Sequence, residues 1–370
     1  MMSITLASLM PGEWFEGGNQ LVLVLIAIVA MVVVIFGADW LVEGAAGIAA
    51  RLGMPKVIIG ATIVSLGTTA PEAAVSVLAA FSGNPGLALG NGVGSIIADT
   101  GLIFGLGCVM VALPADKFVL TRQGWVQFGS ALMLAVLCWV LYHLFGTKAG
   151  IDWTVGVLFL GMLVGYMFIS VKWAKQHPNG EPHLIDTGNK ESDGSPDIDL
   201  DQHDHAGEKS TLALFGLGLL GLVLVIVAGD GLVGSVSELA FQWGVPDVVI
   251  AGTIVALGTS LPELVVGIQS IRKGHAELLV GNVIGADILN VLFVIGAAAV
   301  GAGFAGQSLL IADQTTSFVY VALPTMMAMM IYFRFCIYKA SKVGHFSKWM
   351  GYPLLVGYVA FSVISFMLAK

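Results

Sequence analysis

Long apolar stretches, separated by short breaks of glycine, proline or charged residues, run through most of the chain. A helix needs about 20 apolar residues to cross the hydrocarbon core of a bilayer. The chain supplies ten stretches of this kind, so we predict ten transmembrane helices. Their predicted ranges are 20–48, 57–81, 86–112, 124–145, 151–172, 211–240, 247–272, 276–303, 315–338 and 349–369.

The composition agrees with this pattern. Hydrophobic residues make up 57% of the 370 residues, charged residues only 11%, and the mean hydropathy is +0.92, which is far from the composition of soluble domains. Residues 1–19 carry acidic rather than basic residues, so we expect no signal peptide. Cys108, Cys138 and Cys336 lack a metal-like spacing and are expected to be packing residues. We predict an all-α membrane protein surrounded by lipid, with no cofactor and no nucleic-acid partner; protein partners stay unknown.

Lysine and arginine are distributed unevenly among the predicted loops. If the N-terminus lies outside, fourteen of the 16 Lys and Arg residues fall on the cytoplasmic side, and only Lys148 and Lys370 do not. Cytoplasmic loops of membrane proteins carry an excess of these residues. We therefore expect a multi-pass protein of the bacterial inner, or plasma, membrane with both termini outside.

An internal repeat relates the two halves of the chain. An offset of 191 residues aligns Glu72 with Glu263 without a gap, and nine of the seventeen positions from Gly60 to Ser76 match their counterparts. Five predicted helices separate equivalent points, and this odd number inserts the second copy in the opposite direction. Such inverted repeats are typical of secondary transporters. We predict two inverted five-helix repeats, at 1–172 and 211–370, with their most similar segments at about 57–112 and 247–303.

Residues 173–210 separate the two copies and are rich in Asp, His, Gly and Pro. This composition is typical of a disordered segment, and we interpret it as an acidic cytoplasmic linker. A regulatory metal sensor is the alternative, but the glycine and terminal glutamate of an EF-hand loop are missing.

Two predicted helices carry a proline and a carboxylate in the middle of an apolar span. The first is Gly67-Thr-Thr-Ala-Pro-Glu72 and the second is Gly258-Thr-Ser-Leu-Pro-Glu263. Proline removes a backbone hydrogen bond and opens a helical turn, which presents carbonyl oxygens. Carbonyl, hydroxyl and carboxylate oxygens together suit Na⁺ and Ca²⁺. An intramembrane carboxylate indicates a functional site; the alternative is a protonated glutamate that only caps a broken helix.

The third and eighth predicted helices carry polar groups on glycine-rich segments. Ser95 and Asp99 are four residues apart and share one helical face, and Ala286 and Asn290 occupy the equivalent face of the second copy. We expect these faces to meet the two glutamates.

These paired segments resemble the two alpha-repeats of the calcium/cation antiporter superfamily, in particular its bacterial and archaeal sodium/calcium exchangers. The resemblance covers nearly the whole chain. It implies a ten-helix antiporter, not an enzyme, with one Ca²⁺ site flanked by Na⁺ sites. In this chain the implied ligands are Glu72, Glu263, Asp99, Asn290, Thr68, Thr69, Thr259, Ser260 and Ser95, with backbone oxygens from Ser65 and Ala256.

The chain departs from the family pattern in three respects. Well-known exchangers tend to carry Asn in the first copy and Asp in the second, whereas this chain has Asp99 and Asn290. Ala286 replaces a serine ligand of one Na⁺ site, and Asp287 stands where Asn is common. Asp287 is a further candidate ligand, with helix packing as its alternative role.

Four acids lie in the first and sixth predicted helices, and we interpret them differently from the acids of the Pro-Glu segments. We expect them to make hydrogen bonds near helix ends rather than to line a cation passage. They are Asp39, Glu43, Asp230 and Glu238.

The predicted activity is exchange of Ca²⁺ for Na⁺ by alternating access, which serves Ca²⁺ extrusion. An H⁺/Ca²⁺ antiporter is the closest alternative, although Asp99 favours Na⁺, and dependence on K⁺ stays open. An intramembrane aspartyl protease leaves the doubled Pro-Glu segments unexplained, and the inverted repeat favours alternating access over a passive Ca²⁺ channel.

Overall fold

The computed structural model describes residues 14–52, 55–81, 85–176, 210–243, 256–311 and 318–368. Eight helical spans in this part of the chain are long and apolar enough to cross a membrane. The predicted span at 247–272 is described only from Ala256, and the last predicted span corresponds to α17 (Gly351–Leu368). Most of the predicted linker, residues 177–209, lies outside the described residues.

The first half of the chain is helical apart from two short strands. Its elements are α1 (Gln20–Leu52), α2 (Lys56–Ile59), η2 (Gly60–Val64), α3 (Ser65–Thr68), α4 (Ala70–Phe81), α5 (Pro85–Ala98), η3 (Asp99–Phe104), α6 (Gly105–Met110), β1 (Leu113–Pro114), α7 (Lys117–Phe145), η4 (Gly146–Lys148), β2 (Gly150–Ile151) and α8 (Trp153–Gln176). The second half begins with α9 (Thr211–Gln242). It continues with α11 (Ala256–Thr259), α12 (Leu261–Arg272), α13 (Ala276–Leu289), η7 (Asn290–Ile295), α14 (Gly296–Phe304), β3 (Leu309–Leu310), η9 (Phe318–Ala322), α16 (Leu323–Val343), β4 (His345–Phe346), η10 (Lys348–Met350) and α17.

Most predicted helices agree with these elements, but one begins earlier than predicted. The fourth span was expected from residue 124, whereas α7 begins at Lys117. Asp116 caps it, because its Oδ1 atom accepts a 3.0 Å hydrogen bond from the Val119 amide. Apolar content alone therefore misplaced the start, since the first two turns of α7 contain Lys117 and Arg122.

Helix boundaries in the two halves recur at the 191-residue offset. The π-helices η3 and η7 begin at the equivalent residues Asp99 and Asn290 and are both six residues long. The helices before them, α5 and α13, are both 14 residues long, and α4 and α12 are both 12 residues long. The sequence repeat is thus also a repeat of backbone geometry.

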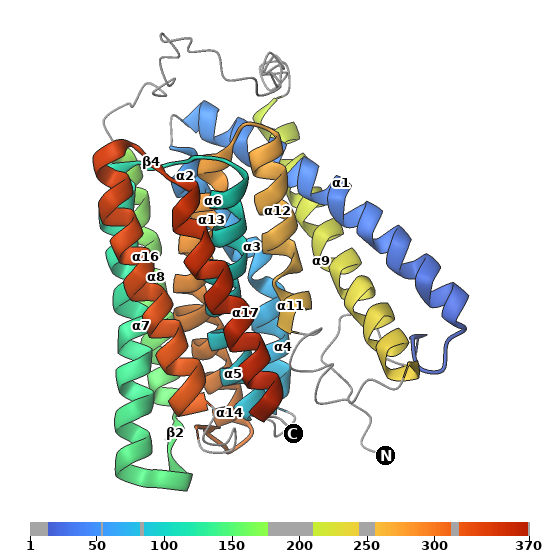
Figure 1. Ribbon diagram of the computed structural model, residues 1–370, viewed down its shortest axis with the longest axis vertical. Helices are drawn as coiled ribbons and strands as arrows, with labels where there is room; N and C mark the ends of the chain where they lie inside the picture. The colour runs from blue at the N-terminus through green and yellow to red at the C-terminus, as the bar shows by residue number, and fades with distance from the viewer. Residues whose placement is uncertain are drawn as a thin grey trace.

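Helices α1 and α9 pack side by side along one edge of the molecule and extend away from the main bundle at one end (Figure 1). Glycines allow this close approach. A Cβ atom at Gly44 would lie 2.7 Å from Gly218 Cα on the neighbouring helix.

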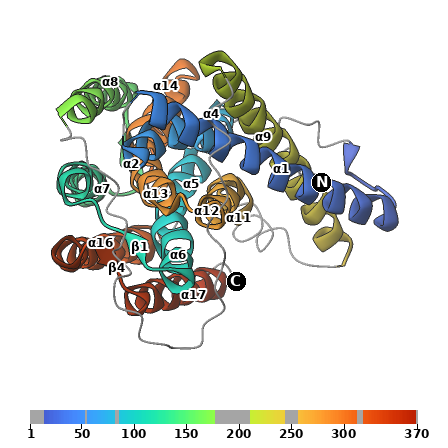
Figure 2. The same cartoon turned by 90° about the horizontal axis from the view of Figure 1, so that it is seen from above.

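Helix α13 lies in the middle of the bundle, among α2, α5, α6 and α12 (Figure 2). Residues 278–290 are all buried, so this helix meets protein on every side. On its surface toward η2, a Cβ atom at Gly285 would lie 2.5 Å from the Ala61 carbonyl oxygen. Gly285 therefore lets two backbones carrying predicted ligands come together.

Two antiparallel strand pairs join the halves at the ends of the helices. β1 pairs with β4, and β2 pairs with β3, each pair taking one strand from each half. Aromatic side chains pack beside the first pair, where Phe104 and Phe346 meet with ring centroids 5.0 Å apart.

Candidate functional site

The two Pro-Glu segments interrupt their helices at equivalent residues. α3 ends at Thr68 and α4 begins at Ala70, while α11 ends at Thr259 and α12 begins at Leu261. Each break falls two residues before a proline, which cannot donate a backbone hydrogen bond. The prediction of an opened turn at these segments agrees with the breaks.

Glu72 and Glu263 are the central carboxylates, and each is 1% exposed. The hydroxyl of Ser260 donates to Glu72 Oε1 at 3.5 Å, and the hydroxyl of Thr69 donates to Glu263 Oε1 at 3.3 Å. Each copy therefore supplies the hydroxyl that contacts the glutamate of the other. The second oxygen of each glutamate, Oε2, is buried and has no hydrogen-bond partner among the described residues.

A second reciprocal pair of contacts lies beside the first. Thr68 donates to Asn282 Oδ1 at 3.3 Å, and Thr259 donates to Asn91 Oδ1 at 3.3 Å. Asn91 also donates to the backbone oxygen of Glu72 at 3.3 Å. The two asparagines are equivalent at the 191-residue offset, but the sequence reasoning gave them no role. Their signal was their identity in both copies, directly after a glycine.

Asp99 and Asn290 meet across the interface between the copies. Asn290 Nδ2 donates to Asp99 Oδ2 at 3.2 Å, and both residues are 1% exposed. The remaining side-chain oxygens, Asp99 Oδ1 and Asn290 Oδ1, have no partner within the described ranges. Ser95 also belongs to this group, because it accepts a 3.5 Å hydrogen bond from Ser260.

The structure brings together most of the predicted ligands. The remaining three, Ser65, Ala256 and Asp287, have different placements. Ser65 is buried, and its backbone oxygen lies 3.4 Å from the Thr68 hydroxyl. Ala256 is the first residue of α11. Asp287 contacts residues outside the predicted ligands, because its Oδ2 atom accepts hydrogen bonds from Thr100 and Gln127. Sequence reasoning missed both of these partners.

The chemistry of this cluster fits a hard cation. Within the described part of the chain, Glu72, Glu263 and Asp99 form no ion pair with Lys or Arg, and each retains a buried oxygen without a partner. No group of three His, Cys, Asp or Glu side chains in that part suffices for a metal on its own. A bound ion would therefore also need the hydroxyl, amide and backbone oxygens, a donor set typical of Ca²⁺ and Na⁺.

Acids of the first helix lie apart from this cluster. Lys273, which follows α12, lies 2.9 Å from Asp39 Oδ1 and 3.8 Å from Glu43 Oε2. It also donates to the backbone oxygen of Asp39 at 3.1 Å. These contacts agree with the expectation that Asp39 and Glu43 bind polar partners near a helix end.

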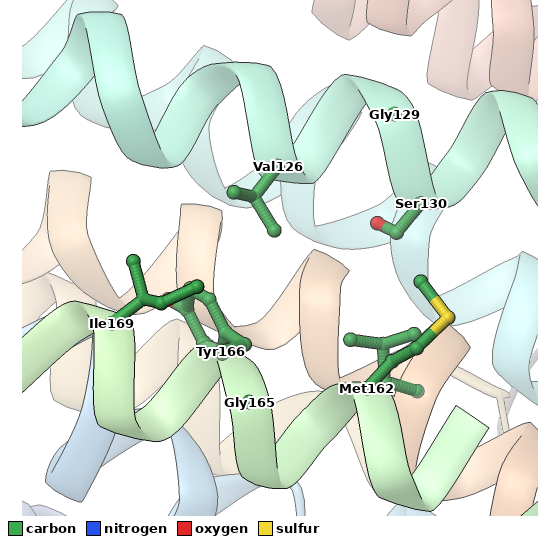
Figure 3. Close-up of a pocket in the computed structure, with 8 residues that line it drawn as sticks. Val126, Gly129, Ser130, Met162, Gly165, Tyr166 and Ile169 are labelled. Atoms are coloured by element: carbon green, nitrogen blue, oxygen red, sulfur yellow. The ribbon is translucent and has the colours of Figure 1, made fainter. Parts of the chain in front are cut away.

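A cavity of about 340 Å³ lies between α7 and α8 (Figure 3). Its lining is mainly apolar, with Leu292 of η7 among the residues around it. The two hydroxyls present are already bonded, because Ser130 donates to the Gln127 carbonyl at 2.9 Å and Tyr166 donates to the Ala61 carbonyl at 3.2 Å. This cavity therefore does not suit a cation.

The fold and the buried oxygen cluster define a multi-pass membrane protein of the transporter class, and the comparisons with known proteins agree. The family model for "Sodium/calcium exchanger protein" matches residues 22–172 and 213–367. The chain belongs to this family.

Two curated relatives are similar over most of their length. The putative antiporter CaxA of Alkalimonas amylolytica is 32% identical over 75% of this chain and 80% of its own. The sodium/calcium exchanger MaX1 of Methanosarcina acetivorans is 28% identical over 92% of this chain and 98% of its own. A solved structure of the sodium-calcium exchanger NCX_Mj, soaked with Na⁺ and Sr²⁺, is 27% identical with a TM-score of 0.70, and covers 92% of this chain and 98% of that one.

Proposed function

We propose that this protein exchanges Ca²⁺ for Na⁺ across the membrane by alternating access. The observation that carries the proposal is the pair of buried glutamates, Glu72 and Glu263. Each is bonded by a hydroxyl of the other copy, and each retains a buried oxygen that has no partner among the described residues. A structural role alone would not require acidic oxygens to stay unpaired at such a depth. Family membership and the names of MaX1 and NCX_Mj support the same activity.

The proposed architecture is ten transmembrane helices in two inverted five-helix repeats. The matching helix boundaries of the two halves support it. The strand pairing supports it too, because β1, after the third predicted span, pairs with β4, before the last one. In an inverted repeat these two connections lie on the same side of the membrane. The same holds for β2 and β3.

The proposed ligands surround the two glutamates. Glu72 and Glu263 hold Ca²⁺ between them, and Asp99 and Asn290 supply oxygens at the middle of the cluster. The hydroxyl and carbonyl donors that complete the flanking Na⁺ sites are Thr68, Thr69, Thr259, Ser260, Ser95, Ser65 and Ala256. Support comes from the burial of the described side chains and from the reciprocal bonds between the copies.

Exchange follows from competition for a limited negative charge. One Ca²⁺ or several Na⁺ neutralise the cluster, but both together leave excess positive charge in a site of low dielectric constant, which is costly. If only the neutralised cluster can change its access from one side to the other, the two ions move in opposite directions. The Na⁺ gradient then drives Ca²⁺ out of the cell.

Movement of α1 and α9 is the proposed switch of access. These two helices pack mainly on each other and extend from the bundle that carries the site (Figure 1). Glycines at the contact between α1 and α9 present no side chains that would interlock the two helices. The proposed orientation places both termini outside a bacterial inner membrane, as the distribution of Lys and Arg favours.

Transport by purified protein in proteoliposomes tests the proposal. Vesicles loaded with Na⁺ should take up ⁴⁵Ca²⁺ when diluted into Na⁺-free buffer, and vesicles with a pH gradient but no Na⁺ should not. Uptake driven by the pH gradient alone would contradict Na⁺ coupling in favour of H⁺. An added requirement for K⁺ on the Ca²⁺ side would identify K⁺-dependent exchange instead.

A further inference from the structure

Asp287 has its own set of polar neighbours, separate from the glutamates. Its Oδ2 atom accepts one 2.6 Å hydrogen bond from Thr100 Oγ1 and another 2.6 Å bond from Gln127 Nε2. Three elements meet at this carboxyl group, because α13 carries Asp287, η3 carries Thr100 and α7 carries Gln127. The three side chains are at most 1% exposed. We call these three residues the Asp287 cluster.

Two oxygen atoms of the Asp287 cluster receive no hydrogen bond from the described part of the chain. Asp287 Oδ1 and Gln127 Oε1 are buried and unpaired among the described residues. Gln123, one helical turn before Gln127, is also 1% exposed with both amide atoms unpaired. Buried polar groups nearly always have a partner, because leaving one unpaired costs free energy. The cluster therefore has oxygen atoms that could bind a ligand, and a bound ligand would remove the free-energy cost of leaving them unpaired.

The bonding pattern selects a cation as that ligand. Hydroxyl bonds of this length are typical of a charged acceptor, and both donors use the same oxygen, Oδ2. No described residue donates a hydrogen bond to Oδ1, so this oxygen is open to a cation. A metal cation would instead use Oδ1, the Gln127 carbonyl oxygen and a free lone pair of the Thr100 hydroxyl. This all-oxygen set suits a hard cation, and a single carboxylate suits a monovalent one.

The charged groups around Asp287 do not replace such a cation. Asp99 on η3, Glu72 on α4 and Glu263 on α12 are carboxyl groups, so they cannot supply a positive charge to this part of the bundle. Arg334 reaches the same stretch of α7 from α16. Its guanidinium group donates to the Leu120 carbonyl at 3.5 Å and lies over the Trp125 ring, 4.2 Å from its centroid.

The repeat shows that the Asp287 cluster is an addition to the duplicated site. At the 191-residue offset, Asp287 corresponds to Ile96 and Thr100 corresponds to Val291. The first copy therefore has no carboxylate where the second copy has Asp287, and the second copy has no hydroxyl where the first copy has Thr100. A purely architectural role in the duplicated fold would not demand a charge at one copy alone.

We infer that Asp287, Thr100 and Gln127 form a binding site for one Na⁺ ion that is distinct from the exchange site. The inference goes beyond the proposed function and uses it only to choose Na⁺ among the alkali cations. The ion stays near the three helices during transport and neutralises a carboxylate that the competition between Ca²⁺ and Na⁺ does not use.

Equilibrium binding of ²²Na⁺ and ⁴⁵Ca²⁺ to purified full-length protein tests the inference. Asp287→Asn should bind one Na⁺ fewer per protein than the wild type and should bind Ca²⁺ with unchanged affinity. Gln269→Leu is the matched control, because Gln269 is another buried glutamine, bonded to the Ile35 carbonyl at 3.4 Å and outside the cluster; it should retain both ions. Loss of Ca²⁺ binding in Asp287→Asn would place Asp287 in the exchange site and overturn the inference.

Two further sets of variants keep the test informative if Asp287→Asn folds poorly. In Thr100→Val the hydroxyl is lost at constant shape, so bound ²²Na⁺ should fall, whereas Thr100→Ser should retain it. With Glu72→Gln and Glu263→Gln combined, Ca²⁺ binding should vanish while one Na⁺ remains. Adding Asp287→Asn should remove that Na⁺, and adding Asp99→Asn should not; the reverse result would contradict the inference.

Potassium serves as the competitor in the same assay. Unlabelled K⁺ that displaces the remaining ²²Na⁺ as well as unlabelled Na⁺ does would overturn the choice of Na⁺. The binding assay is independent of the proposed exchange activity. A wild type that binds this Na⁺ but fails to exchange Ca²⁺ would contradict the proposed function alone.

Discussion

In the first copy of the repeat, Ser95, Ile96 and Asp99 lie on α5 and at the start of η3, whereas the second copy has Ala286, Asp287 and Asn290 at the same places. The backbone around them is the same in both copies, down to the residue at which each π-helix begins. The two copies thus keep the same helix boundaries while their candidate ligands differ. Each copy holds one carboxylate on this segment, but in a different place.

The glutamates differ from these neighbours, because both copies retain them and each is bonded by a hydroxyl at the equivalent position of the other copy. Thr69 bonds Glu263 and Ser260 bonds Glu72, so neither glutamate is complete without the other copy. A site of this kind requires symmetry at its centre and tolerates asymmetry at its edges. The predictions below test where that boundary lies.

The largest expected effect is at the symmetric centre. Glu72→Gln and Glu263→Gln should each lower Na⁺-driven ⁴⁵Ca²⁺ uptake by about 100-fold or more, because each removes a charge that the Ca²⁺ ion would neutralise. The two losses should be similar, since the copies contribute equally there. Glu277→Gln is the control, because Glu277 lies in the first turn of α13, away from the described contacts of the cluster; it should transport normally.

A large difference between the two glutamate variants would contradict the symmetric centre. Full activity in either one would remove the exchange site from these residues altogether. Size-exclusion profiles of the variants would show that the loss of uptake is not a loss of folding.

Much of this centre could be predicted from the sequence, because the evidence for it is local and occurs twice. The Pro-Glu segments predicted the helix breaks at Thr69 and Ser260, since proline acts on its own turn. The burial of Glu72 followed from the apolar residues around it. The 191-residue offset then identified which residues of the second half are equivalent to those of the first.

The Asp287 cluster could not be predicted in the same way. Gln127 lies on α7, outside the strongly repeated segments, and it reaches Asp287 only because α7 packs against α13. That packing depends on side-chain shapes from several helices, which no local pattern records. The contact between Lys273 and Asp39 was missed for the same reason, since 234 residues separate them.

Exchanging the charge between the copies should have a smaller effect than removing a glutamate. Asp99→Asn alone should lower ⁴⁵Ca²⁺ uptake by about 10-fold, because it removes a carboxylate and leaves two facing amides. The double variant Asp99→Asn with Asn290→Asp should recover most of the activity, since the 3.2 Å bond between these side chains can form in either direction. Initial rates at saturating Ca²⁺ would measure both.

If the double variant stays as inactive as Asp99→Asn, the charge is required in the first copy, and the two edges of the site are not interchangeable. Asn290→Asp alone supplies the comparison. It adds a second carboxylate opposite Asp99, and this added negative charge should strengthen Na⁺ binding at a pH at which both groups are ionised.

A matched pair of glycines tests whether the copies pack alike. A Cβ atom at Gly285 would lie 2.5 Å from the Ala61 carbonyl oxygen and 2.6 Å from Ala61 Cα, whereas the equivalent Gly94 has nothing within 4 Å. Gly285→Ala should therefore destabilise the protein by about 1–3 kcal/mol through overpacking. Gly94→Ala should be neutral or slightly stabilising, because alanine favours the helix.

Thermal unfolding of the purified variants in one detergent would measure this difference. Equal melting temperatures for the two alanine variants would contradict the asymmetric packing of α5 and α13. Ca²⁺ uptake by Gly285→Ala at low temperature would separate a loss of stability from a shift of the ligands.

The smallest expected effect comes from restoring the missing serine of the second copy. Ser95 accepts a hydrogen bond from Ser260 in the first copy, and the repeat places Ala286 at the equivalent position, where it is fully buried. Ala286→Ser should lower the Na⁺ concentration for half-maximal exchange by about two- to threefold, because a hydroxyl adds an oxygen ligand to one Na⁺ site. Ser95→Ala should raise that concentration by a similar factor. Ala286→Cys is the matched control, since sulfur has nearly the same size as oxygen but is a poor ligand for Na⁺. If cysteine raises the Na⁺ affinity as serine does, the gain comes from filling space and not from an oxygen ligand.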